Sequence, residues 1–91
     1  MMRFEKLMIA FVDMMEADGY SVLMVQKPDV RTYIIKLSDD DVQGFDYVHG
    51  AVRFIEEYYP RIHAEHSTKE GGILEIIFKE NVGKLQIEAI E

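Results

Sequence analysis

Three residues in the second half of the chain carry side chains that bind divalent cations in other proteins: His63, Glu65 and Glu75. Alternate residues of a β-strand point to the same face of a sheet, so a strand over residues 62–67 places His63 and Glu65 on one face and His66 on the other. A neighbouring strand brings Glu75 to the same outer face. We therefore expect a candidate metal site there, with a solvated acidic surface as the alternative.

Three aromatic residues, Tyr47, Phe54 and Tyr58, form a second candidate site. At about 100° per residue they lie on one side of a predicted helix. The helix already has an apolar stripe that can cover a sheet: Phe45, Val48, Val52, Ile55 and Tyr59. Because the aromatic side chains exceed what that packing needs, we expect them to contact a second subunit or a partner protein. The alternative is that the helix near the amino terminus covers them.

The remaining motifs give no support for catalysis or for a cofactor. Ser38 and the three acids Asp39, Asp40 and Asp41 are typical of a helix start, and less so of a magnesium site. The chain has no cysteine, which excludes thiolate metal sites and cysteine nucleophiles. No serine or threonine lies in a motif that would activate it, so we expect a protein that is not an enzyme.

The charge balance excludes several kinds of partner. Ten Lys and Arg residues against seventeen Asp and Glu residues give a net charge of −7, and the basic residues are scattered. Nucleic-acid binding and attachment to anionic membranes are therefore not expected. No apolar run is long enough to cross a bilayer, and no signal peptide is apparent, so we expect a cytoplasmic protein.

Periodicity assigns the elements. Apolar residues at three- and four-residue steps predict a helix over residues 2–18, ended by Gly19. Strands are predicted over 20–26 and 31–37, joined by a turn at Lys27, Pro28 and Asp29. A second helix is predicted from Ser38 to Tyr59, followed by strands at 62–67, 73–79 and 84–90. The last two strands form a predicted hairpin in which Leu74, Ile76 and Phe78 share one face.

This order, αββαβββ, predicts a single α+β domain over residues 1–91, in which two helices cover one face of a mainly antiparallel sheet. Without its extra strand the order αββαββ is that of a circularly permuted ferredoxin-like unit, a likeness of topology that implies no activity. We expect a small interaction or regulatory domain that self-associates as a homodimer, through the aromatic side chains or a sheet edge. A small-ligand or divalent-metal-binding protein that uses the outer sheet face is the alternative.

Overall fold

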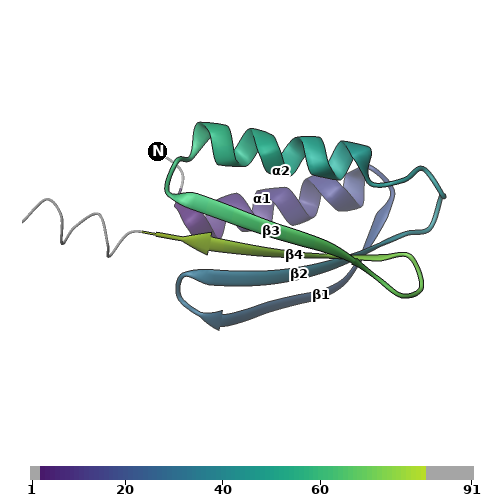
Figure 1. Ribbon diagram of the computed structural model, residues 1–91, viewed down its shortest axis with the longest axis horizontal. Helices are drawn as coiled ribbons and strands as arrows, with labels where there is room; N and C mark the ends of the chain where they lie inside the picture. Colours follow the sequence, from purple (N-terminus) through teal and green to yellow (C-terminus); the bar gives the residue numbers. More distant parts are fainter. Residues whose placement is uncertain (1–2, 82–91) are drawn as a thin grey trace, which may run out of the picture.

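Two helices cover one face of a four-stranded antiparallel sheet (Figure 1) in the computed structural model, which describes residues 3–81. In chain order the elements are α1 (Phe4–Ala17), β1 (Tyr20–Asp29), β2 (Thr32–Asp39), α2 (Asp46–Tyr58), β3 (Ile62–Lys69) and β4 (Ile73–Glu80). Neither helix is long and apolar enough to cross a membrane. The predicted two-layer α+β architecture is therefore confirmed.

The strands lie in the order β1-β2-β4-β3, and all neighbours are antiparallel. This is the sheet of a ferredoxin-like unit whose first strand has moved to the end of the chain, as αββαββ predicts. The segment at Ile62 joins the sheet as the edge strand β3. The predicted hairpin between residues 73–79 and 84–90 is wrong, because β4 already has β2 on one side and β3 on the other. The predicted strand 84–90 itself lies outside the described residues.

The core lies between the two central strands and the helices. The inward side chains of β2 and β4 are almost wholly buried: Tyr33, Ile35, Leu37, Leu74, Ile76 and Phe78. Each helix turns its main apolar stripe onto them, led by Met8, Phe11 and Met15 on α1 and by Val48, Val52 and Ile55 on α2. The Phe11 and Phe78 rings meet edge to face with their centroids 5.2 Å apart, an arrangement that aromatic pairs favour.

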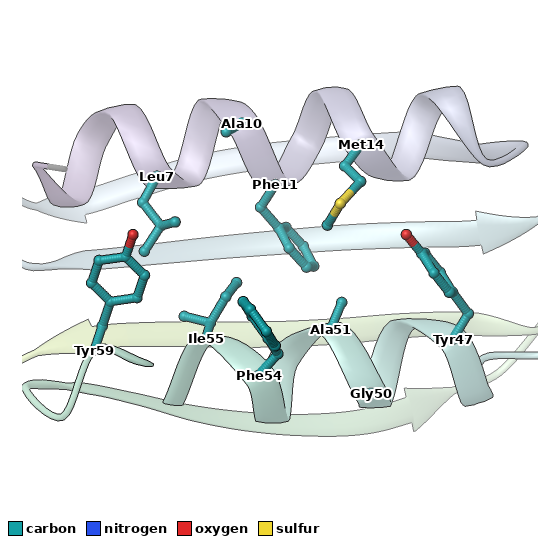
Figure 2. Close-up of a pocket in the computed structure, with 10 residues that line it drawn as sticks. All are labelled: Leu7, Ala10, Phe11, Met14, Tyr47, Gly50, Ala51, Phe54, Ile55 and Tyr59. Carbon is teal, nitrogen blue, oxygen red and sulfur yellow. The ribbon is translucent and has the colours of Figure 1, made fainter. Parts of the chain in front are cut away.

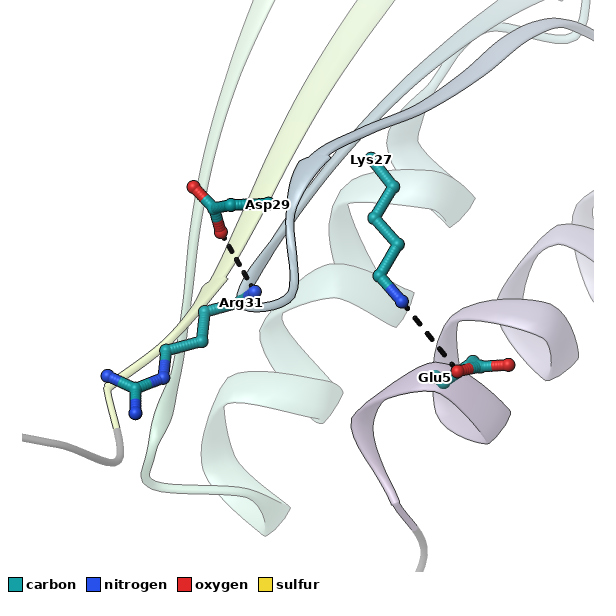
Figure 3. Close-up of polar contacts among 4 residues, drawn as sticks. All are labelled: Glu5, Lys27, Asp29 and Arg31. Atoms are coloured by element: carbon teal, nitrogen blue, oxygen red, sulfur yellow. Dashed lines mark hydrogen bonds and ion pairs between the residues drawn. The ribbon is translucent and has the colours of Figure 1, made fainter.

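The hairpin between β1 and β2 turns two residues later than predicted (Figure 3). Asp29 pairs with Thr32 across a loop of Val30 and Arg31, and the Asp29 carboxylate accepts a hydrogen bond from the Arg31 amide at 2.8 Å. Pro28 therefore lies within β1, where an edge strand tolerates its missing N–H group. Asp29 sets the turn through its own side chain.

The predicted helix start at Ser38 is also wrong, because α2 begins only at Asp46. Ser38 and Asp39 end β2, and their polar groups bond to the loop that follows. Ser38 donates to Asp40 at 3.0 Å, and Asp39 accepts from the Gly44 amide. Val42 and Gly44 have φ angles of 53° and 82°, which no right-handed helix contains. The acidic run therefore organises a loop and does not cap a helix.

Gly19 ends α1 as predicted: the last helical residue is Ala17, Asp18 is the C-cap, and Gly19 follows it. Its φ is +96°, in the region that favours glycine, and a Cβ atom added there would lie 2.7 Å from Asp41 Oδ2. The chain turns at Gly19 from α1 directly into β1, so this conformation positions the helix on the sheet.

We expect Gly19→Ala to lower the free energy of unfolding by about 1–3 kcal/mol, because alanine is strained at this φ and crowds Asp41. Gly50→Ala is the matched control. Gly50 lies within α2 and its Cβ would meet nothing within 4 Å, so alanine there is expected to stabilise the protein by up to about 1 kcal/mol. Urea unfolding followed by circular dichroism measures both. Equal stabilities of the two variants would contradict this role of Gly19.

Candidate functional site

An apolar groove of 520 Å³ runs between α1 and α2 on the side of the helices away from the sheet (Figure 2). Ten residues line it: Leu7, Ala10, Phe11, Met14, Tyr47, Gly50, Ala51, Phe54, Ile55 and Tyr59. None of them carries a charge at neutral pH. A concave apolar surface of this size is typical of a binding site.

The groove exists because the two helices pack on the sheet and hardly on each other. Leu7, Phe11 and Ile55 belong to the buried stripes and form its floor. Above them, the facing sides of the helices carry Ala10 on α1 and Gly50 and Ala51 on α2. Side chains this small leave the space between the helices unfilled.

The three aromatic residues predicted as an interface lie along this groove, and α1 does not cover them. The exposed fractions of Tyr47, Phe54 and Tyr58 are 49%, 56% and 67%. Tyr47 and Phe54 line the groove, and the Tyr58 ring stacks on Phe54 with the centroids 4.3 Å apart. The alternative that helix packing buries these side chains is therefore wrong.

Tyrosine hydroxyls and carboxylates give the groove a polar, acidic end. Tyr47 and Tyr59 stand at opposite ends and direct their hydroxyl groups toward α1 (Figure 2). A hydrogen bond with the Asp18 side chain, followed by partial burial, raises the pKa of Tyr47 above its ordinary value. Burial first, and then the charges of Asp39, Asp18 and Asp46, also raise the pKa of Tyr20. Three carboxylates therefore cluster at the Tyr47 end of the groove.

The predicted metal ligands are placed on the outer sheet face but are not gathered into one site. On β3, His63 faces Lys79 of β4 and Glu65 faces Ile77, whereas Glu75 lies opposite Ser67. The Glu75 carboxylate is 3.8 Å from the Lys36 amine and 3.7 Å from the Lys69 amine. Among residues 3–81, no three His, Asp or Glu side chains form a group that could hold a metal ion.

A pair of histidines, His49 of α2 and His66 of β3, was not predicted from the sequence. Their ring centroids are 4.3 Å apart. The Nδ1 atom of His49 is buried without a hydrogen-bond partner in the described part of the chain. The strand alternation that directs His66 away from His63 also directs it toward the helices. This signal was available, but the sequence did not specify that α2 lies over β3.

Comparison of the chain with protein-family models, with curated proteins and with solved structures found no match.

His49 gives a prediction for the pH dependence of stability. Burial, and then the neighbouring His66 and Arg53, lower the pKa of His49 from 6.5, while Asp46 acts in the opposite direction. The unfolded chain therefore takes up a proton on His49 more readily than the folded protein does. The contribution of neutral His49 to the free energy of unfolding is fully present above about pH 6.5 and decreases as the pH falls below that value. We expect the free energy of unfolding to decrease less in His49→Gln than in the wild type between about pH 7.5 and about pH 5.

The control for the loss of an imidazole is His63→Gln, which removes an exposed histidine from the outer face. Denaturant unfolding at each pH measures the three proteins. If His49→Gln and His63→Gln change the pH dependence of the free energy of unfolding by the same amount, the packing of His49 against His66 does not cause that dependence.

Proposed function

We propose that this protein is a non-enzymatic interaction domain whose groove between α1 and α2 binds an amphipathic helix of a partner protein. The observation that carries the proposal is the exposed, uncharged groove itself, with Tyr47 and Phe54 along one wall and Tyr58 stacked on Phe54 at its border. Amphipathic helices dock in such grooves through apolar side chains at i, i+3, i+4 and i+7.

The dimensions of the groove support a helix as its occupant. Along α2 the lining residues run from Tyr47 to Tyr59, which corresponds to about 18 Å at the rise of an α-helix. A bound helix of about three turns fits this length and offers three or four apolar anchors. The small residues Ala10, Gly50 and Ala51 in the walls allow a backbone to approach closely.

The exposed aromatic side chains support a macromolecular partner. A phenylalanine or tyrosine carries about 200 Å² of surface, so the exposed parts of Tyr47, Phe54 and Tyr58 together present about 340 Å². The largest apolar patches of monomeric proteins are about 300–600 Å² and are often functional. Aromatic residues of this kind commonly supply most of the binding energy of an interface.

Charge favours a basic partner over a second copy of this chain as the occupant of the groove. The chain has a net charge of −7, and Asp18, Asp39 and Asp46 cluster at the Tyr47 end of the groove. A second copy would bring the same negative charge and the same concave surface. A partner helix with lysine or arginine at one end is complementary to both features.

The test uses a synthetic peptide of about four helical turns. It carries leucines at i, i+3, i+4 and i+7, glutamines elsewhere and two lysines at its amino-terminal end, where the helix dipole is also positive. We expect binding to shift the amide resonances of Ala10, Met14 and Ala51. A peptide of equal composition with leucines on all sides of the helix is expected to bind much more weakly.

Variants of the protein locate the binding site. Ala10→Arg places a long charged side chain in the groove and is expected to weaken peptide binding by at least about tenfold. Gln26→Arg, at an exposed position of β1 that does not line the groove, adds the same charge and is its control. The double variant Phe54→Gln and Tyr58→Gln is expected to weaken binding while leaving the fold intact, because both side chains are more than half exposed.

Three results would overturn this function. The first is no binding of the leucine-striped peptide, and the second is equal weakening by Ala10→Arg and Gln26→Arg. The third is a shift of the amide resonances of Ala10 and Met14, on the α1 side of the groove, on raising the protein concentration without peptide, since this would mean that a second copy fills the groove.

A further inference from the structure

The two edges of the sheet differ in how well they are protected against pairing with another strand. The register of β1 against β2 shifts twice, between Val22 and Met24 and between Gln26 and Asp29, and Pro28 removes one N–H group from this edge. Bulges and prolines are devices that prevent edge-to-edge pairing. By contrast, β3 pairs with β4 without interruption from Ile62 to Lys69 and contains no proline.

Acceptors on α2 and on the residue that follows it bond only to the first half of the outer edge of β3. The Ile62 amide donates to the Tyr59 carbonyl at 2.8 Å, and the Ala64 amide donates to the Glu56 carboxylate at 3.1 Å. The Ala64 amide therefore points away from β4. Backbone groups alternate along a strand, so those of His66 and Thr68 point to the same free edge. Both residues are exposed, and no other element of the described chain bonds to that edge there.

We propose that two copies of this protein pair through the open half of β3, antiparallel, about a two-fold axis at Ser67. In this register His66 of each copy lies opposite Thr68 of the partner subunit, and the outward amides and carbonyls of the two residues bond reciprocally. The Ala64 amide keeps its bond to Glu56. The two sheets then form one continuous sheet, with the helices of both copies on the same face.

Among two-fold axes at the outer-face residues of β3, charge selects the one at Ser67. A two-fold axis at Ser67 places Glu65 opposite Lys69 of the partner subunit, and symmetry repeats the pair. Shifting the axis to Glu65 would bring two glutamates face to face, and shifting it to Lys69 would bring two lysines face to face. Like charges directly opposite destabilise a pair of strands, whereas opposite charges stabilise it. In the free molecule the Glu75 carboxylate lies near the amines of both Lys69 and Lys36. Lys69 can therefore turn toward Glu65 of the partner subunit while Lys36 still neutralises Glu75.

The helix above this edge has a compatible charge pattern. His49 packs on His66, so this part of α2 lies next to the proposed axis. Asp46 and Arg53 lie one turn before and one turn after His49, on the same side of the helix. The two-fold axis therefore turns Arg53 of each copy toward Asp46 of the partner subunit.

Charge reversal tests the pairing. By analytical ultracentrifugation from about 1 µM to about 1 mM, we expect the wild type to form a dimer as concentration rises. Glu65→Lys alone and Lys69→Glu alone each create two like-charge contacts and are expected to weaken the dimer by at least about tenfold. The double variant is expected to dimerise again. An equimolar mixture of the two single variants is expected to form a heterodimer, because its contacts are complementary.

The controls separate this local effect from net charge and from folding. Glu16→Lys and Lys79→Glu make the same charge changes at exposed positions outside the proposed ion pair and are expected to leave the dimer unchanged. Circular dichroism checks the fold of each variant. Amide hydrogen exchange is expected to slow at His66 and Thr68 as the dimer forms.

A wild type that remains monomeric throughout the concentration range would overturn the proposal. So would single variants that dimerise like the wild type, or controls that weaken the dimer as much as they do. None of the residues changed in these dimer variants lines the groove between the helices. The outcome is therefore independent of the peptide-binding experiment.

Discussion

The packing of both helices onto the apolar ladder of β2 and β4 is the interaction on which the rest of the molecule depends. The inward side chains of these central strands are buried, and sixteen apolar residues form one continuous core with no buried polar or charged residue in the described chain. A domain of this size has a small core, so each helix must commit its main apolar stripe to the sheet. The position of every other surface follows from this requirement.

The groove is a direct consequence of that commitment. Once α1 and α2 have turned Phe11 and Ile55 toward the sheet, the facing sides of the helices carry alanine, glycine and wide-spaced aromatics. These side chains do not fill the space between the helices, and Phe54 and Tyr58 stack on each other at its border. The exposed apolar surface is thus built into the fold, and the groove that we propose as a binding site needs no further element to form it.

The same packing leaves the two sheet edges unequal. Because β4 is central, β3 becomes an edge, and α2 lies over it closely enough for Glu56 to bond to Ala64 and for His49 to contact His66. The helix protects one half of this edge and leaves the other half open. Glu65 and Lys69 lie on either side of the open half, where a neighbouring strand would meet both charges.

The amino-acid sequence by itself determined the elements and the faces that they bury. Residue periodicity is a local property, and it specified the apolar stripes of α1 and α2 and the buried face of Leu74, Ile76 and Phe78. It also identified the surplus aromatics of α2. It misplaced the start of α2, because Ser38 and the acids that follow have the composition of a helix cap but bond to a loop.

Only the tertiary structure decided which elements became neighbours. The central position of β4, the separation of the helices and the contact of His49 with His66 join residues that are far apart in the chain. Such contacts depend on the volumes and directions of side chains from several elements at once, and local periodicity contains no information about them. The sequence therefore specified the apolar and polar surfaces of each element, while packing determined that some of them would meet and that others would form a groove and an open edge.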